Sequence, residues 1–173
     1  RGLAELQAAG IAVTCGIEEQ AARHLNAPYL KRVESQLPWI IAKWAMSLDG
    51  RLAARTGHSR WISSPTSRQV VQQLRSRVDA IVVGSRTALM DDPLLTARTA
   101  ASPARVAVRV VLDSTLQLPL DSRLVATATQ FPLLLWAGPD APADKAHALE
   151  QRGCQVHRSS LVSRTERLDE LLT

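Results

Sequence analysis

The segment Asp79-Ala-Ile-Val-Val-Gly-Ser-Arg-Thr-Ala-Leu-Met90 leads from an apolar run directly into a helical pattern. The run from Asp79 to Gly84 is almost unbroken in its hydrophobicity, which is typical of a strand buried on both faces of a sheet. Residues Ser85 to Met90 predict the short helix that follows. Strands that alternate with helices are typical of α/β proteins, so the segment predicts an α/β fold with a largely parallel sheet.

The same alternation continues on both sides of this segment. Upstream, Trp39 to Ala45 predicts another buried strand, and Ser64 followed by Pro65 predicts the start of a helix. Ligands bind at the carboxyl ends of strands in such sheets, so functional residues are expected directly after them. Downstream, strands are predicted at residues 106–113, 132–138 and 154–157, and helices at 141–152 and 165–172.

The first part of the chain has a different organisation. Helices are predicted at residues 2–10 and 18–25, with a short β-branched strand from Ile11 to Cys15 between them. A break at residues 26–28 and the polar residues 31–36 predict a linker. We therefore expect a domain boundary near Glu34. Because the chain begins without methionine, we also expect it to be part of a longer protein.

The composition is that of an ordinary globular protein, with 46% apolar and 21% charged residues among 173. The longest apolar runs, 39–42 and 131–137, are too short to cross a membrane. The net charge of +5 is compatible with nucleic-acid binding, but the arginines are scattered and aromatic residues make up only 3%. We therefore expect an enzyme that binds small anions, with neither a nucleic-acid nor a membrane partner.

The cysteines and histidines point to no metal centre. Cys15 and Cys154 are far apart in the sequence, which predicts two reduced thiols in or near the core of a cytoplasmic protein. The four histidines show no metal-ligand spacing with one another or with either cysteine. No metal is expected.

Four polar clusters lie at the predicted ends of strands and helices, at residues 43–50, 57–65, 84–87 and 91–98. Lys43 lies within an apolar run, where a charged side chain is costly unless it is paired or has a function. The alternatives are a side chain that reaches solvent at the sheet edge or pairs with an aspartate. In the second cluster, Ser64 is expected to cap a helix whose N-terminus attracts anions, and Trp61 either fills the core or contacts a ligand.

The third and fourth clusters carry further candidates. Gly84 lets a ligand approach the backbone and Thr87 offers a hydroxyl in a first helical turn, although the G-x-G-x-x-G dinucleotide fingerprint is absent. The fourth cluster, D-D-P-L-L-T-A-R, is a polar loop stiffened by its proline. There, Asp91 either stabilises a cationic carbon or belongs to a turn with a surface ion pair. Arg75 and Arg98 together are candidates to hold a phosphate.

Five segments carry a resemblance to one family: K-W-A-M-S-L-D-G (43–50), G-H-S-R-W-I-S-S (57–64), R-S-R-V-D-A-I-V-V-G-S-R-T (75–87), D-D-P-L-L-T-A-R (91–98) and R-V-V-L-D-S (109–114). In this order and spacing they resemble the reductase domain of the riboflavin biosynthesis bifunctional deaminase/reductase family, over residues 37–114. Residues 1–34 look like the closing segment of that family's deaminase domain, which implies domains at 1–34 and 35–173. The zinc signature of the deaminase is absent, so no deamination is expected.

The resemblance implies a dihydrofolate-reductase-like fold, with a mostly parallel sheet flanked by helices. It also implies NADPH-dependent reduction of 5-amino-6-(5-phosphoribosylamino)uracil to 5-amino-6-(5-phosphoribitylamino)uracil, by hydride transfer to the imine carbon of the ring-opened sugar. A cytoplasmic homodimer is expected from the same resemblance. Carried over by position, cofactor contacts are Ala45, Trp61, Thr87 and Ser114, substrate contacts are Ser59, Arg75, Asp91, Leu95 and Arg98, and catalytic candidates are Asp91 and Lys43.

One departure from the family pattern sets a further expectation. The family continues to a glutamate followed by two glycines that open a phosphate-binding loop, and no such tripeptide occurs before Thr173. We therefore expect a reductase domain that is incomplete at its C-terminus, inactive by itself and weak in NADPH binding. The alternatives are a reductase of the same fold acting on a pterin-type substrate, which the 57–64 and 91–98 segments argue against, and a non-catalytic scaffold that assembles dimers.

Overall fold

The computed structural model describes residues 2–98 and 106–173 of the chain. The chain divides into two compact units, which are considered separately. One comprises the residues up to Ala42 together with Glu170–Thr173, and the other comprises Lys43–Asp169.

The N-terminal unit contains three short helices, α1 (Gly2–Ala8), α2 (Glu19–Leu25) and α3 (Ala27–Ser35). The first two match the predicted helices. The prediction of a strand from Ile11 to Cys15 is wrong, since this segment has no strand and Cys15 is exposed. The prediction of a linker at residues 31–36 is also wrong. Pro28 lies in the first turn of α3, where its missing N–H costs nothing, so it favours a helix start rather than a break.

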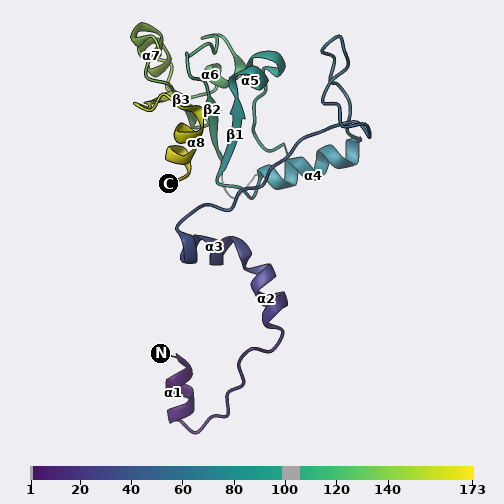
Figure 1. Ribbon diagram of the computed structural model, residues 1–173, viewed down its shortest axis with the longest axis vertical. Helices are drawn as coiled ribbons and strands as arrows, with labels where there is room; N and C mark the ends of the chain where they lie inside the picture. The colour runs from purple at the N-terminus through teal and green to yellow at the C-terminus, as the bar shows by residue number, and fades with distance from the viewer. Residues whose placement is uncertain (1, 99–105) are drawn as a thin grey trace. The chain divides into compact units, whose positions relative to one another are not determined.

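The second unit is built on a four-stranded parallel sheet with the order β1-β2-β3-β4 (Figure 1). The α/β fold and the parallel sheet are therefore confirmed. The strands are β1 (Ala80–Gly84), β2 (Val108–Leu112), β3 (Leu133–Ala137) and β4 (Gln155–Arg158). The first three fall within apolar runs predicted as strands, and β4 overlaps the strand predicted at residues 154–157 and extends one residue beyond it.

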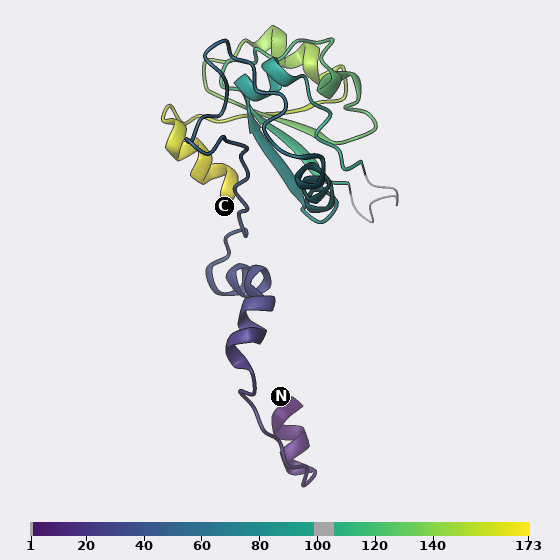
Figure 2. The same cartoon turned by 90° about the vertical axis from the view of Figure 1, so that its right-hand side faces the viewer.

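Helices complete this unit and supply its core. The core joins β2 and β3 to three helices through fully buried side chains such as Val111, Leu135, Leu124 and Leu149. Figures 1 and 2 show these helices beside the sheet. In β3 buried residues alternate with half-buried ones, so that its fully buried side chains share one face. The helices of the unit are α4 (Pro65–Arg75), α5 (Ser85–Asp91), α6 (Arg123–Ala126), α7 (Ala143–Glu150) and α8 (Arg164–Leu172).

The start of α4 agrees with the sequence. The Ser64 hydroxyl accepts a hydrogen bond from Ser67 N at 3.1 Å, and Pro65 occupies the first turn. None of the residues of α4 is fully buried, although its apolar stripe predicts burial, and Val70 is exposed.

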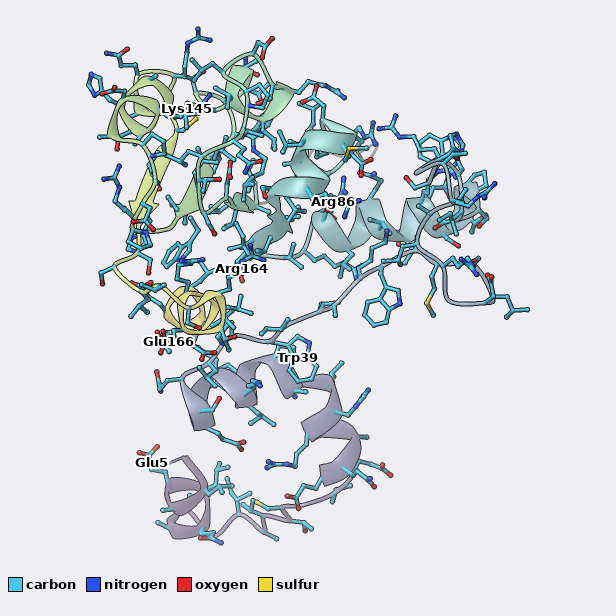
Figure 3. The ribbon with its side chains drawn as sticks, turned by 45° about the horizontal axis from the view of Figure 1, so that its top comes forward. Glu5, Trp39, Arg86, Lys145, Arg164 and Glu166 are labelled. Atoms are coloured by element: carbon cyan, nitrogen blue, oxygen red, sulfur yellow. The ribbon has the colours of Figure 1, made fainter. Side chains whose placement is uncertain are left out.

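The prediction of a buried strand from Trp39 to Ala45 is wrong. The segment forms no strand, and Trp39 and Trp44 are exposed (Figure 3). An apolar run becomes a buried strand only when a neighbouring strand satisfies its backbone, and no strand of the described residues pairs with this one. Residues 97–107 are rich in alanine, threonine, serine and proline, which predicts a loop, and most of them lie outside the described residues.

The two outer strands of the sheet differ in character. Among the described residues β1 pairs only with β2, and its Val82 is 45% exposed. On the other side β4 pairs with β3 and ends in the polar pair His157 and Arg158. The sheet thus has one apolar and one polar outer strand.

Candidate functional site

The residues 91–98 form the centre of the candidate site. They begin at the last residue of α5 and include two non-glycine residues with left-handed backbone, Asp92 (φ 37°) and Leu95 (φ 57°). Leu95 is only 3% exposed. Such backbone conformations are costly for residues with a Cβ and persist where the surroundings hold them. We call residues 91–98 the substrate loop.

Hydrogen bonds tie the substrate loop to three different elements of the second unit, and one bond to each element illustrates this. Each uses a backbone group of the loop or of its neighbour, so the bonds fix the path of the chain as well as its side chains. They join Asp92 Oδ1 to Arg123 N of α6 at 2.9 Å, Leu94 O to Arg109 Nη1 of β2 at 3.3 Å, and Gln72 Oε1 of α4 to Arg98 N at 2.9 Å.

Asp91 has a cationic neighbour that the sequence did not reveal. Arg60 Nη2 donates to the Asp91 carbonyl at 3.1 Å and lies 3.7 Å from its Oδ1. Both side chains are about half exposed. An exposed ion pair contributes little to stability, so replacing Arg60 by a ligand as the partner of Asp91 costs little free energy. The carboxylate is therefore accessible to a ligand.

Arg75 and Arg98 lie close enough for their charges to interact. Burial and then the positive charge of Arg98 lower the pKa of Arg75. Arginine nevertheless stays protonated in proteins, so two guanidinium groups repel each other beside the loop. A bound phosphate would replace that repulsion by two favourable contacts. The bond from Arg98 N to Gln72 of α4 places Arg98 beside the helix that ends at Arg75, and their role as a phosphate site stays a prediction.

Ser59 and Trp61 line a shallow pocket of about 290 Å³ together with Ser47 and His58. Trp61 is 72% exposed, and the guanidinium of Arg68 lies 4.3 Å from the centre of its ring. The interpretation of Trp61 as a core residue is therefore wrong. An exposed aromatic face beside a hollow can stack on a planar ligand.

The other predicted contacts are spread along the edge of the sheet. Thr87 is exposed in the first turn of α5, and Ser114 follows the end of β2. The Ser114 hydroxyl accepts a hydrogen bond from Arg167 Nη2 at 3.0 Å, and its carbonyl accepts one from Gly138 N at 2.9 Å. Ser114 and Gly138 thus lie at the carboxyl ends of neighbouring strands, where a ligand is expected. Ala45 is half-buried. Within the described residues, no hydrogen bond or ring contact joins the four predicted cofactor residues to one another.

Lys43 does not occupy the environment that made it a candidate. It is exposed, in a segment without strand structure, so the argument from the cost of burying its charge no longer applies.

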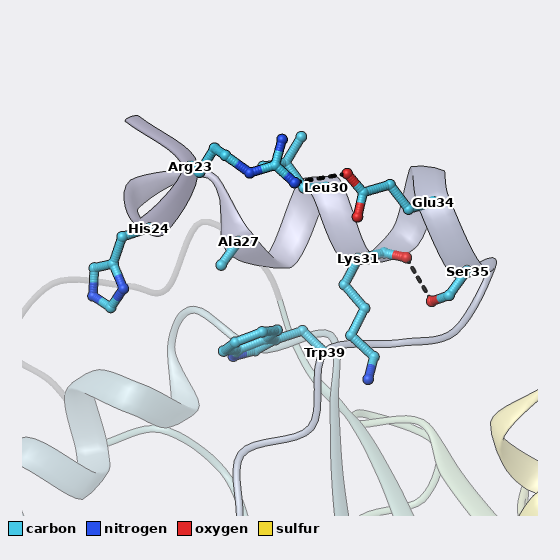
Figure 4. Close-up of a pocket in the computed structure, with 8 residues that line it drawn as sticks. All are labelled: Arg23, His24, Ala27, Leu30, Lys31, Glu34, Ser35 and Trp39. Atoms are coloured by element: carbon cyan, nitrogen blue, oxygen red, sulfur yellow. Dashed lines mark hydrogen bonds and ion pairs between the residues drawn. The ribbon is translucent and has the colours of Figure 1, made fainter. Parts of the chain in front are cut away.

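A second pocket lies entirely within the N-terminal unit (Figure 4). Its volume is about 570 Å³, and Trp39 and Lys31 line it. Arg23 Nη2 forms an ion pair with Glu34 at 3.1 Å beside it. None of the residues predicted as catalytic, cofactor or substrate contacts lines this pocket.

The described residues hold no group of three or more His, Cys, Asp or Glu side chains arranged for a metal ion. No helix in this part of the chain is long and apolar enough to cross a bilayer.

Sequence reasoning did not single out two arginines that the structure buries. Arg109 lies inside a strand, and Arg167 on α8 is largely buried. Lys43 was predicted as a functional residue because its charge lies within an apolar run. Arg109 also lies within an apolar run and was not predicted. Arg60 carried no such signal, since its pairing with Asp91 depends on a contact 31 residues along the chain.

Comparisons with known proteins identify the family. Residues 38–172 match the model of the RibD C-terminal domain. The chain is 36% identical to the riboflavin biosynthesis protein RibD of Aquifex aeolicus (strain VF5), over 90% of this chain and 43% of the relative. It is 40% identical to RibD of Chlamydia muridarum (strain MoPn / Nigg), over 92% of this chain and 43% of the relative. The chain thus spans less than half the length of these relatives.

Solved structures agree with the sequence relatives. RibD of Acinetobacter baumannii superposes with a TM-score of 0.74 at 29% identity, covering 96% of this chain and 45% of that chain. A Thermotoga maritima protein described as a diaminohydroxyphosphoribosylaminopyrimidine deaminase/5-amino-6-(5-phosphoribosylamino)uracil reductase gives 0.71 at 25% identity, with 98% and 52% covered. With its parallel sheet, its flanking helices and these relatives, the chain belongs to the RibD C-terminal domain family.

Proposed function

We propose that this chain carries the reductase part of a riboflavin-pathway enzyme, which reduces 5-amino-6-(5-phosphoribosylamino)uracil to its ribitylamino counterpart with NADPH. Membership of the RibD C-terminal domain family supports a reductase of the nicotinamide-dependent kind. The reaction named for the Thermotoga maritima relative supports the choice of substrate.

The observation that carries the proposal is the pairing of Arg75 with Arg98. The substrate bears a phosphate monoester, and two guanidinium groups that repel each other provide a site for such a dianion. Arg98 ends the substrate loop and Asp91 begins it. A ligand whose phosphate binds the arginines therefore has its sugar within reach of the rest of the loop.

Asp91 is proposed to act on the reacting sugar. The ring-opened substrate carries an imine, and a carboxylate beside it stabilises the positive charge of the protonated form. Bound NADPH would supply the hydride to the imine carbon. Arg60 holds Asp91 in the free protein, through the carbonyl and the carboxylate. Leu95 is buried, so its proposed contact with the substrate uses the backbone. Lys43 stays a second catalytic candidate on the strength of the resemblance.

The residues at the carboxyl end of the sheet fit a phosphate-bearing cofactor. A Cβ on Gly138 would lie 3.1 Å from both Arg167 Nη1 and the Ser114 carbonyl, so glycine lets Arg167 and Ser114 approach the backbone closely at the ends of these strands. Arg167 donates to the Ser114 hydroxyl, which leaves the hydroxyl proton available for an anionic acceptor. We propose that these residues hold part of NADPH, with Trp61, Thr87 and Ala45 as further contacts.

The domain organisation is also a proposal. Residues 1–34 are proposed to end a preceding deaminase domain, which is supported by the start of the family match at residue 38 and by the separate N-terminal unit. A cytoplasmic homodimer is proposed from the family resemblance.

The test is NADPH oxidation by the full-length protein with the phosphoribosylamino-pyrimidine as substrate. Asp91→Asn should lower kcat about 100- to 1000-fold, because it removes a charge directed at the transition state. Asp121→Asn, at an exposed aspartate outside the site, is the matched control and should leave kcat unchanged.

Each failure of this test has its own meaning. Reduction of a dihydropterin but not of the phosphoribosylamino-pyrimidine would replace the substrate. A folded protein that responds to neither NADPH nor substrate would support a non-catalytic scaffold.

A further inference from the structure

We propose that Arg109 is a positioning residue of the reductase site, which holds the substrate loop in its binding conformation through the carbonyl of Leu94. The expected effect on the reaction rate rests on the proposed function. The expected effect on the conformation of the loop rests on geometry alone. Neither the resemblance nor the sequence motifs assign Arg109 a role.

Arg109 is fully buried, with 0% of its surface exposed, and uses its guanidinium for several hydrogen bonds. Within residues 2–98 and 106–173, all of its acceptors are uncharged. They are Leu94 O and Thr127 Oγ1 at 3.3 and 2.8 Å from Nη1, Leu124 O and Thr127 O at 3.3 Å from Nη2, Phe131 O from Nη2, and Pro132 O at 3.5 Å from Nε.

The acceptors belong to two parts of the chain that are distant in sequence. Leu94 lies in the substrate loop, and the others lie between α6 and the start of β3, at Leu124, Thr127, Phe131 and Pro132. The planar fork of the guanidinium can donate in several directions at once, which a lysine ammonium cannot do with the same geometry. Arg109 therefore connects the loop to the rigid sheet.

Packing alone does not explain this residue. Burying a charge without a carboxylate partner is costly, and an aliphatic side chain fills a strand position without that cost. Arg109 instead leaves its charge among carbonyl groups, one of which belongs to the loop that carries Asp91 and Arg98. The bond to Leu94 is the part of this network that reaches the site.

The hydrogen bond between Leu94 and Arg109 holds the middle of the substrate loop. Leu94 precedes Leu95, which holds a left-handed backbone at φ 57°. Other hydrogen bonds of the loop lie on either side of it, at Asp91 and Asp92 before it and at Arg98 after it. Loss of the middle bond would let the loop relax between its ends and displace Asp91 relative to Arg98. A displacement of about 1 Å at a reacting group can cost about 100-fold in rate.

The test compares Arg109→Lys with Thr127→Val in the full-length protein. Thr127→Val removes one acceptor of Arg109 on the α6 side and leaves the bond to Leu94 in place, so it is the matched control for lost stability. Well below both unfolding temperatures, Arg109→Lys should lower kcat/KM about 100-fold with most of the loss in kcat, and Thr127→Val should keep it within about threefold.

A second measurement does not depend on catalysis. Hydrogen exchange of the peptide covering residues 91–98 should become at least about tenfold faster in Arg109→Lys, while the α7 peptide 143–150 keeps its protection. Unchanged exchange in the loop would overturn the inference, as would equal losses of kcat/KM in the two variants. If the wild-type protein reduces no phosphoribosylamino-pyrimidine, the proposed function falls and the exchange result alone decides the role of Arg109.

Discussion

Replacement of Arg98 by alanine should separate ligand binding from stability. In the free protein, Arg98 repels Arg75 and lowers its pKa. Removing that charge relieves the repulsion, so we expect the free energy of unfolding of Arg98→Ala to stay within about 0.5 kcal/mol of wild type or to rise. The backbone bond from Arg98 N to Gln72 Oε1 does not involve the side chain and survives the change.

Phosphate binding should become weaker in Arg98→Ala, although stability is kept. A hydrogen bond between charged groups contributes about 1.5–3 kcal/mol, which corresponds to a loss of affinity of about 10- to 150-fold. Arg75→Ala should give a loss of the same order. Because both arginines are proposed to hold one phosphate, their losses should not add in the double variant.

The assay is calorimetric titration of the full-length protein with ribose 5-phosphate, and with ribose as the unphosphorylated control. Arg86→Ala removes an exposed arginine of α5 and controls for total charge. Arg98→Ala should weaken ribose 5-phosphate binding and leave ribose binding unchanged. Equal losses for the two sugars, or an equal loss in Arg86→Ala, would refute the phosphate site.

Two further changes test the core of the second unit and its cysteine. Leu135→Ala should lower the free energy of unfolding by about 2–5 kcal/mol, because Leu135 is fully buried, whereas Leu134→Ala on the half-buried face should cost less; urea unfolding measures both. Equal losses would contradict the one-sided core. Burial raises the pKa of Cys154 above its ordinary value of 9.0, so the folded thiol keeps its proton where the unfolded one loses it. Stability should therefore fall as the pH rises above about 9, a trend that Cys154→Ala abolishes. In the folded protein at neutral pH, mass spectrometry should find iodoacetamide on exposed Cys15 and not on Cys154.

The strands of the second unit were predictable because local sequence and tertiary packing agree there. The run Asp79–Gly84 is apolar and ends in glycine, and β1 occupies Ala80–Gly84. The run Trp39–Ala45 is also mostly apolar, with Lys43 inside it, and forms no strand. Composition indicates that a segment is suited to a sheet, but a strand also needs a partner for its backbone groups. Single-sequence patterns contain no information about that partner.

The candidate site could also be predicted from the sequence only in part. Arg75 and Arg98 were predicted as a pair from the phosphate that two arginines can hold and from the family resemblance, and in the structure their charges interact. The ion pair of Arg60 with Asp91 and the network of Arg109 were not predicted. Each depends on residues 15 or more positions apart in the chain, and no local pattern marks such contacts.

The unequal outer strands of the sheet affect how the protein behaves at high concentration. A strand with free N–H and C=O groups is a template for another chain, and proteins commonly protect it with charged side chains. The strand β4 carries Arg158, whereas β1 is the all-apolar sequence Ala-Ile-Val-Val-Gly with Val82 exposed. Unwanted association of molecules should therefore begin at β1. Val82→Lys would place a charge on this strand and should keep the isolated chain in solution.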